Sequence, residues 1–287
     1  MHDLRFAPIQ HDSATLAKYG ALFAACFPGT GKFTPSYLQW LYVANPDGDA
    51  VGYDAWDGER LAAHYVCVPA RAWIEGREVL VLLSLNTATH PDYQGKGLFT
   101  KLAAMTYEAG AQAGFEGVYG VANANSTPGF VRKLGFQLVR PLEARIGLGR
   151  LQHAPKPAAG TLSFERSWSP ASLAWRCANP HNRVHAVANG SGKRLQLHAA
   201  AMGRHLPAYA ELDAQAGLAP AGGAAPSPLR LFIGLAPDAG SRYWNYASIP
   251  MRLRPSPLNL IWRAFTPRVP LLDASRIEFT FLDFDAY

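Results

Sequence analysis

The clearest chemical signal in the sequence is a glycine-containing turn, residues 94–99 (Gln-Gly-Lys-Gly-Leu-Phe), between an apolar strand and a helix. The start of a helix carries unpaired N–H donors and a partial positive charge. Glycines remove the Cβ atoms that would keep a phosphate away from these donors. Between Asp92 and Glu108 the charged residues are Lys96 and Lys101 alone, although acidic residues usually occupy a first helical turn. The pattern therefore predicts that an external anion binds at this helix start.

Two well-known phosphate-binding motifs do not match the sequence. A Rossmann fingerprint requires a third glycine where Thr100 stands. A Walker loop does not fit either, because Gly31-Lys32 is followed by Phe33 and Cys26 stands where its first glycine belongs. For the two glycines taken alone, an ordinary strand-to-helix turn remains an alternative interpretation, so the surrounding sequence has to decide.

The stretch from residue 79 to residue 136 resembles the GNAT superfamily of acyl-CoA N-acyltransferases. The family pattern is a strand, His-Pro-x-Tyr, a Gln-Gly-x-Gly turn, a helix, a second strand, and a helix that ends in Lys-Leu-Gly-Phe. This sequence supplies His90-Pro91-Asp92-Tyr93 before the turn, an apolar strand at residues 117–122, and Lys-Leu-Gly-Phe at residues 133–136. The order and the spacing both agree. The resemblance implies that acetyl-CoA or a related acyl-CoA donates an acyl group to an amine.

The resemblance also implies which residues would bind the acyl-CoA. Backbone N–H groups of residues 95–100 would hold its pyrophosphate. The strand end at residues 86–88 would pair with the pantetheine arm and polarise the thioester carbonyl. The predicted cofactor-binding residues are Asn86, Thr87, Ala88, Gln94, Gly95, Lys96, Gly97, Leu98, Phe99, Thr100 and Asn125. The acceptor amine would attack directly, and a base or a chain of waters must first remove its proton.

Two departures from the family pattern concern the chemistry. Many members have Gly or Ala where Phe99 stands, which suits the fold if the ring points into the core, since only the backbone N–H is needed. Many members also place a Tyr, the acid for the leaving thiolate, where this chain has Val131. Asn125 or Ser126 could donate a hydrogen bond instead, and Tyr119 could face either the acyl site or the core. These three residues are the predicted catalytic candidates.

Apolar periodicity and capping residues predict an α/β order of elements. One helix is expected at residues 12–27, capped by Asp12 or Ser13, and another begins at Thr34-Pro35. Further helices are expected at residues 97–110 and 127–134. The predicted strands span residues 51–56, 61–69, 79–85, 117–122 and 137–148.

Part of this order occurs twice. The matching residues, first copy against second, are Thr34-Pro35 and Ser169-Pro170, Leu38 and Leu173, Trp40 and Trp175, Ala44-Asn45-Pro46 and Ala178-Asn179-Pro180, Gly58 and Gly192, Arg60 and Arg194, Leu61 and Leu195, and His64 and His198. An ordered set of matches predicts two copies of one fold. The second copy contains nothing like the Gln-Gly-Lys-Gly turn, so we do not expect it to bind the same ligand in the same way.

We therefore predict an α/β fold of tandem GNAT-like domains, each with a mixed, mostly antiparallel central sheet flanked by helices. Residues 1–150 would form the acyl-CoA-binding catalytic domain, and residues 151–160 an Ala/Pro-rich linker. Residues 161–287 would form a degenerate GNAT-like domain that contributes to the acceptor site. A low-complexity stretch from Ala214 to Pro228 is predicted to be a surface loop.

Composition limits the partners and the cellular location. The 287 residues carry a net charge of +6 without a run of Lys and Arg, so nucleic acid is not expected as a partner. Three cysteines far apart in sequence fit neither a disulfide framework nor a metal site. The longest apolar run, residues 79–85, is too short to span a membrane, and the start of the chain lacks a signal peptide's apolar core. We expect a cytoplasmic protein without metal or membrane partners; its oligomeric state is not predicted.

The remaining candidates concern the acceptor amine. Residues 277–287 alternate apolar and polar residues and predict a closing strand. Asp283 and Asp285 either belong to a solvated terminus or reach the groove between the halves, where they would bind or deprotonate a cationic amine. His64 and His198 recur in both copies, which favours packing over catalysis. The expected acceptor is an amino sugar, free or nucleotide-linked, or another small amine such as an antibiotic or an amino acid. An inactive CoA-binding or scaffold protein is the alternative from another class.

Overall fold

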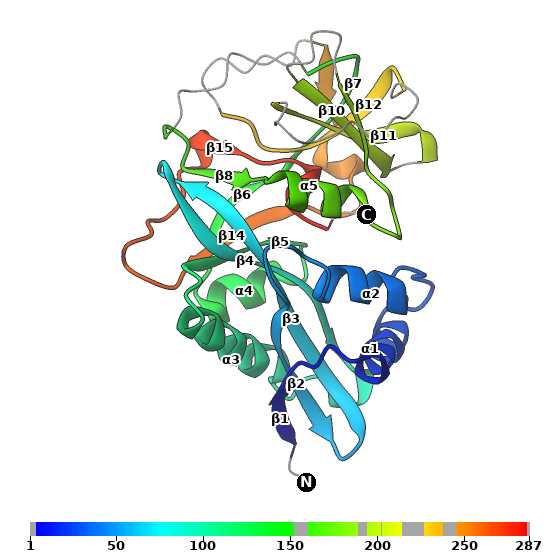
Figure 1. The fold of residues 1–287 in the computed structure, drawn as a ribbon, viewed down its shortest axis with the longest axis vertical. Coiled ribbons are helices and arrows are strands. Elements are labelled where there is room, and N and C mark those ends of the chain that lie inside the picture. The colour runs from blue at the N-terminus through cyan, green and yellow to red at the C-terminus, as the bar shows by residue number, and fades with distance from the viewer. Residues whose placement is uncertain are drawn as a thin grey trace.

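The computed structural model describes residues 4–151, 160–188, 194–201, 203–213, 227–237 and 245–285. Apart from its two end residues, the predicted linker lies outside this part of the chain, and so does most of the low-complexity stretch. The described strands form two sheets, and helices cover both faces of the larger one (Figure 1). Within the described residues, no helix combines the length and the apolarity needed to cross a membrane.

The larger sheet contains strands from both halves of the chain. Its spatial order is β1-β2-β3-β4-β5-β14-β6, and β8 pairs with both β3 and β15 beside this path. The β4–β5 and β8–β15 pairs are parallel, and the other pairs are antiparallel. The bounds are β1 (Arg5–Pro8), β2 (Val51–Asp57), β3 (Arg60–Ile74), β4 (Arg77–Thr89), β5 (Gly117–Ala122), β6 (Gln137–Pro141), β8 (Phe164–Ser167), β14 (Asn259–Ala264) and β15 (Ile277–Glu278).

The first two helices begin at the capping residues that the sequence predicts. Asp12 accepts hydrogen bonds from the N–H groups of Ala14 and Thr15, and Thr34 accepts one from Tyr37. α1 and α2 cover one face of the larger sheet, and α3 and α4 cover the other (Figure 1). The bounds are α1 (Ser13–Cys26), α2 (Pro35–Tyr42), α3 (Leu98–Gln112), α4 (Thr127–Leu134) and α5 (Pro170–Cys177), with 3-10 helices η1 (Pro91–Tyr93), η2 (Met251–Leu253), η3 (Ala274–Arg276) and η4 (Phe281–Asp283).

The smaller sheet repeats the strand order of the larger one. Its order is β9-β10-β11-β12-β7-β13, with β11 and β12 parallel and the other neighbours antiparallel. Parallel and antiparallel neighbours follow one another in the same order along β2-β3-β4-β5-β14-β6 of the larger sheet. The predicted α/β class with two mostly antiparallel sheets is confirmed. The bounds are β7 (Glu143–Leu148), β9 (His185–Ala188), β10 (Arg194–Ala201), β11 (Gly203–Asp213), β12 (Leu229–Gly234) and β13 (Tyr246–Ser248).

Each half of the chain contributes to the sheet of the other, the second half through β8, β14 and β15 and the first half through β7. β14 from the second half lies between β5 and β6, and β7 from the first half lies between β12 and β13. The single strand predicted at residues 137–148 is therefore wrong. It breaks at Leu142, whose N–H donates to the Leu258 carbonyl, and then continues in the other sheet. The two sheets consequently do not divide at residues 151–160. An unbroken apolar pattern cannot show where a chain leaves one sheet for another.

The repeated helices α2 and α5 pack against each other through their matching tryptophans. The Trp40 and Trp175 rings are stacked, with centroids 4.8 Å apart. Each indole N–H donates to the backbone carbonyl of the other tryptophan, at 2.9 Å in both directions. The matching residues Asn45 and Asn179 also repeat a role, because each side-chain oxygen accepts the N–H two residues later. Residues that match in sequence thus make matching contacts across the junction of the two halves.

The described part of the C-terminal segment, residues 277–285, does not form the closing strand predicted for residues 277–287. β15 covers only two residues, and the chain then turns into η4. Thr280 and Asp283 close this turn reciprocally, because each side chain accepts a hydrogen bond from the other end. Local side-chain bonds therefore compete successfully with the extended conformation that the alternation suggests.

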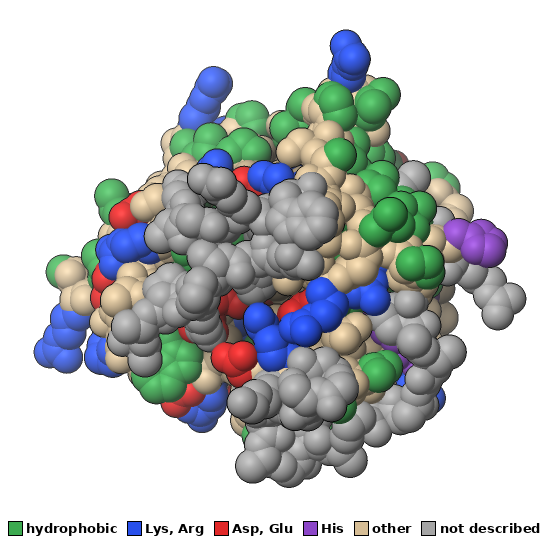
Figure 2. All heavy atoms as spheres, turned by 90° about the horizontal axis from the view of Figure 1, so that it is seen from above, with side chains coloured by type: hydrophobic (Ala, Val, Ile, Leu, Met, Phe, Trp, Pro, Cys, Tyr) green, Lys and Arg blue, Asp and Glu red, His purple; other side chains and the backbone are tan. Residues whose placement is uncertain are grey.

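The end of the molecule formed by the smaller sheet carries charges of both signs. Figure 2 shows Lys and Arg side chains beside Asp and Glu side chains on this face. In the same sheet, Arg150 lies 3.3 Å from the buried carboxylate of Glu211, and Arg194 lies 3.8 Å from it. Arg150 and Arg194 thus offset the charge of the buried Glu211 carboxylate.

Candidate active site

The parallel strands β4 and β5 pair only over part of their length. Their register runs from Val81 opposite Gly117 to Ser84 opposite Gly120. Beyond Ser84, β4 continues to Thr89, and among the described strands only β3 pairs with it there. We call residues 85–89 the open edge of β4, since the side that faces away from β3 has no partner among these strands. The predicted cofactor residues Asn86, Thr87 and Ala88 all lie on it.

A β-bulge interrupts this open edge at Asn86. His64 of β3 pairs with Ala88, whereas Val66 pairs with Leu85, so β4 carries one extra residue between them. Asn86 has φ +46°, in the left-handed region that few non-glycine residues adopt. Such a residue is held by its surroundings, and bulges of this kind re-aim backbone and side-chain groups next to functional sites.

The glycine turn leads into α3 with its N–H donors uncovered. Gly95 and Gly97 both have φ +75°, and Gly97 is the N-cap of α3. Within the described structure no side chain caps this helix, and its first turn contains no acidic residue. A Cβ added at either glycine would meet no described atom within 4 Å, so open space lies in front of the turn. The structure thus brings the predicted residues 94–100 together at a helix start that can bind an anion.

Cationic side chains flank the turn without filling it. The Lys96 Nζ lies 4.7 Å from the centroid of the Tyr93 ring, within cation–π range. Arg60 donates to the Asp92 carboxylate at 2.7 Å, and this hydrogen bond lowers the pKa of Asp92. The Tyr93 hydroxyl donates to Asp57 at 2.6 Å and so ties η1 to β2. These contacts fix the segment that precedes the glycines.

The Phe99 ring points into the core, as the sequence analysis requires for a bulky residue at this position of the family pattern. Its ring packs between Tyr65 and Phe130, with centroids 5.9 and 5.2 Å away. A Cβ at Gly129 would come within 3.1 Å of the same ring, so the small residue in α4 makes room for it. The ring therefore points into the core between α3 and α4, while its backbone N–H stays in the first turn of α3.

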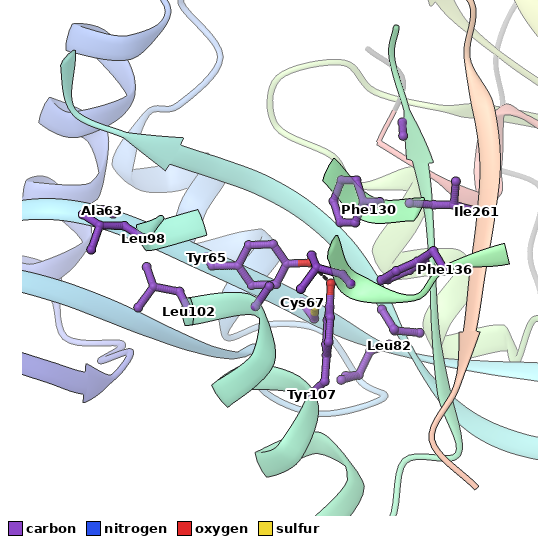
Figure 3. Close-up of a cluster of buried hydrophobic side chains, with 14 of the residues drawn as sticks. Ala63, Tyr65, Cys67, Leu82, Leu98, Leu102, Tyr107, Phe130, Phe136 and Ile261 are labelled. Atoms are coloured by element: carbon purple, nitrogen blue, oxygen red, sulfur yellow. Dashed lines mark hydrogen bonds between the residues drawn. The ribbon is translucent and has the colours of Figure 1, made fainter. Parts of the chain in front are cut away.

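A polar cluster that the sequence did not reveal lies in the core beneath the open edge of β4. Figure 3 shows the rings of Tyr65 and Tyr107 directed toward each other within the apolar cluster. The Tyr65 hydroxyl lies 2.6 Å from the hydroxyl of Ser84, the last β4 residue that pairs with β5. Burial raises the pKa of both tyrosines well above the usual range, so both hydroxyls stay protonated.

The two predicted hydrogen-bond donors at the start of α4 differ in their availability. The Asn123 side chain accepts the N–H groups of Asn125 and Ser126, both at 3.0 Å. The Ser126 hydroxyl lies 3.1 Å from the same oxygen and donates within this turn. The Asn125 side chain is exposed, and no described residue hydrogen-bonds to its amide. Of the two candidates, Asn125 is therefore the one whose donor is available to a ligand.

Tyr119 lies in the core rather than at the acyl site. Its side chain is fully buried, and its ring packs against Phe164 and Phe279 on the sheet face opposite α3. The hydroxyl donates to the backbone carbonyl of Asp283 at 2.8 Å. Burial also raises the pKa of this hydroxyl, so it keeps its proton, which takes part in the hydrogen bond to Asp283. The structure therefore removes Tyr119 from the catalytic candidates.

Asp283 and Asp285 are buried, so the expectation of a solvated terminus is wrong. Asp283 accepts hydrogen bonds from the Thr280 N–H at 2.6 Å and the Trp168 indole at 3.1 Å, and burial raises its pKa to about 6. Asp285 lies 2.6 Å from the Lys32 ammonium, and the Tyr37 hydroxyl also donates to it. Both carboxylates thus contact protein groups at the junction of the halves.

The second half does reach the start of α4. The Ser256 hydroxyl accepts the Ala124 N–H at 3.3 Å, and the Asn259 amide donates to the Thr127 hydroxyl at 2.9 Å. Both residues come from the segment that leads from the smaller sheet into β14. The strand exchange therefore carries residues of the second half to the edge of the candidate site.

Comparisons with known proteins agree with this geometry. Residues 10–139 match the family model described as acetyltransferase (GNAT) domain. No curated protein matches the chain. Among solved structures, a GCN5-related N-acetyltransferase from Anabaena variabilis ATCC 29413 is similar with a TM-score of 0.62 and 11% identity, covering 90% of this chain and 72% of that one. One from Kribbella flavida gives 0.62 and 15%, covering 91% and 71%.

A third structural relative is a conserved protein of unknown function from Enterococcus faecalis V583, described as a probable N-acyltransferase. It gives a TM-score of 0.61 at 11% identity, covering 91% of this chain and 73% of that one. At such identities the three structures support the fold alone, across both halves of the chain. The family model covers the open edge of β4, the glycine turn and α4, where the predicted site lies. The chain thus carries a match to the GNAT acetyltransferase domain at residues 10–139, and it shares its fold with the three solved structures across both halves.

Proposed function

We propose that this protein transfers an acetyl group from acetyl-CoA to the amino group of a small molecule. The observation that carries the proposal is the uncapped start of α3. Its N–H donors, with Gly95 and Gly97 in front of them, face open space without an acidic side chain in the first turn. Pyrophosphate oxygens would accept charge-assisted hydrogen bonds from these N–H groups. The site would lie in the first half alone, because the second copy has no equivalent turn in its sequence.

The open edge of β4 would bind the rest of the donor. Backbone groups of residues 85–89 would pair with the amides of the pantetheine arm, as a strand would. A backbone N–H near the bulge would donate to the thioester carbonyl, a contribution that is typically about 3–4 kcal/mol in the transition state. The neutral acceptor amine would attack the carbonyl carbon and form the carbon–nitrogen bond. The nitrogen would lose one proton to a base or a chain of waters, the carbon–sulfur bond would break, and the thiolate would leave with a hydrogen bond from Asn125.

For the acceptor we propose an amino sugar, free or linked to a nucleotide, and second another small amine such as an antibiotic or an amino acid. The acceptor would enter near the start of α4, where the second half contributes Ser256 and the exposed residues Met251 and Leu253 lie in the same segment. We place the reaction in the cytoplasm, in keeping with three cysteines that are all unpaired.

One observation favours a second candidate, a CoA-binding protein without catalytic activity. Val131 stands where many family members have the Tyr that protonates the leaving thiolate. A CoA thiol with a pKa of about 8–9, like that of Cys, leaves without such an acid, which favours the enzyme.

Turnover with a panel of amines separates the two candidates. The purified protein is incubated with acetyl-CoA and amino sugars, nucleotide-linked amino sugars, aminoglycosides or amino acids, while released thiol and acetylated product are both measured. The enzyme requires thiol release that depends on one class of amine and yields its acetylated product. Binding of CoA without amine-dependent thiol release for any class would instead support the inactive protein.

A further inference from the structure

A chain of buried hydrogen bonds connects β2, β3 and α2 to the bulge in β4. The Asp54 carboxylate of β2 lies 2.7 Å from Nδ1 of His64 in β3. Nε2 of His64 lies 3.0 Å from the Tyr42 hydroxyl at the end of α2, which accepts the Asn86 amide N–H at 3.3 Å. Asp54, His64 and Tyr42 are at most 1% exposed, so water does not compete for these bonds. The chain therefore joins β2, two strands away, to the open edge of β4.

The donors and acceptors of this chain are compatible with one another. The Asp54 carboxylate can only accept, so Nδ1 of His64 carries a proton. A single proton joins Nε2 of His64 and the Tyr42 hydroxyl, and the hydroxyl oxygen accepts the Asn86 amide N–H. Burial raises the pKa of Tyr42, which keeps its hydroxyl protonated. The Tyr19 hydroxyl donates to the second oxygen of Asp54 at 2.8 Å, so every member of the chain has a hydrogen-bond partner.

The second copy of the fold shows that the fold itself does not need this chain. The counterpart of His64 is His198, which stacks against His185 with ring centroids 5.2 Å apart. His185 lies opposite His198 in its strand pair, as Asp54 lies opposite His64, and Cys177 stands at the position that matches Tyr42 in the repeat. The second copy therefore has neither the carboxylate nor the phenol of this chain. The histidine therefore recurs for packing, as predicted, while the polar chain belongs only to the half with the glycine turn.

We propose that Asp54, His64 and Tyr42 are positioning residues for acyl transfer. They hold the Asn86 side chain, and with it the left-handed bulge that aims the N–H groups of residues 86–88 at the thioester carbonyl. This inference rests on the proposed function. A proton relay is the poorer interpretation of the same contacts, because the chain ends in an amide N–H that does not take up a proton. Misplacing a reacting group by about 1 Å can lower a rate on the order of 100-fold.

Tyr42→Phe tests the chain, because it removes one hydroxyl and keeps the ring. We expect kcat to fall on the order of 10- to 100-fold, while Kd for CoA, measured by calorimetry, changes less than about threefold. The matched control is Tyr209→Phe, which removes another buried tyrosine hydroxyl, one that donates to Glu211 in the smaller sheet. It should leave kcat unchanged. Equal kcat values for wild type and Tyr42→Phe would overturn the inference.

Substitutions at Asn86 provide a rescue that a merely structural role would not produce. Glycine adopts positive φ without strain, whereas alanine does not. Asn86→Gly should therefore retain clearly more activity than Asn86→Ala, and Tyr42→Phe should cost less kcat in the Asn86→Gly background than in the wild type. Equal losses for the Gly and Ala variants would contradict the positioning role, and this comparison stands even if Tyr42→Phe does not fold. A wild type that neither binds CoA nor turns over acetyl-CoA would instead refute the proposed function.

Discussion

The substitution Gly97→Asp places a negative charge where the pyrophosphate is expected. Gly97 has φ +75° at the N-cap of α3, and its added Cβ would meet no described atom within 4 Å. The protein therefore has room for the new side chain, and its main cost to folding is the left-handed backbone, about 1 kcal/mol for a residue such as Asp that tolerates this region. The loss should appear in binding rather than in folding.

The size of the binding loss follows from two contributions. A charge-assisted hydrogen bond at the helix start stabilises the complex by about 1.5–3 kcal/mol. Two like charges about 5 Å apart repel by about 3 kcal/mol at an effective dielectric constant of 20. Even if the phosphate shifts and relieves part of this repulsion, CoA binding loses at least about 2 kcal/mol, which raises Kd about 30-fold.

Calorimetric titration of CoA into the folded variant measures this effect. Gly114→Asp is the matched control, because Gly114 also has positive φ and open space around it, but it follows the other end of α3. It carries the same change in charge and a similar backbone cost, and should leave Kd for CoA unchanged. A folded Gly97→Asp protein with wild-type affinity would refute the reasoning, because the pyrophosphate would then have to bind elsewhere.

Three further predictions concern the chemistry, the pH dependence and the junction of the halves. If Asn125 donates to the leaving thiolate, Asn125→Ala should lower kcat on the order of 10- to 100-fold in a stopped thiol-release assay. The Ser126 hydroxyl donates inside its own turn, so Ser126→Ala should lower the melting temperature and leave kcat nearly unchanged. The Asp283 carboxyl has a folded pKa of about 6 against about 4 unfolded, so its stabilising contribution is complete below pH 4 and is lost as the pH rises through 6. The free energy of unfolding should therefore fall by roughly 2–3 kcal/mol more between pH 4 and pH 7 in the wild type than in Asp283→Asn, measured with urea; parallel curves would contradict this. Trp40→Ala removes the ring stack and the hydrogen bond from the Trp40 indole to the Trp175 carbonyl. It should lower the free energy of unfolding by about 3–5 kcal/mol, and a loss under 1 kcal/mol would contradict tight packing at this junction.

Local signals in the sequence predicted the local structure well. Asp12 and Thr34 cap their helices, and β5 and α4 begin and end at the predicted residues. The glycine turn was recognisable because two glycines before a helix whose first turn lacks an acidic residue are typical of an anion-binding helix start. Such features depend on neighbouring residues alone, so the sequence contains them directly.

Long-range features could not be predicted in the same way. The strand exchange leaves no mark in the apolar pattern, since residues 137–148 look the same whether they serve one sheet or two. The alternation before Asp283 predicts a strand, but tertiary contacts bury this segment and its capping bonds turn it. The chain from Asp54 to Asn86 joins residues from four elements, and His64 alone gave no sign of partners on β2 and α2.

The structure of the complex with an acetyl-CoA analogue whose thioester sulfur is replaced by a methylene tests the central claim most directly. We expect one bound molecule in the first half, with pyrophosphate oxygens about 2.7–3.2 Å from N–H groups of residues 95–100. Its pantetheine arm should lie along residues 85–89, with the carbonyl oxygen within the same distance of an N–H among residues 86–88. A pyrophosphate bound away from the start of α3, or a carbonyl that points away from the bulge at Asn86, would contradict the account.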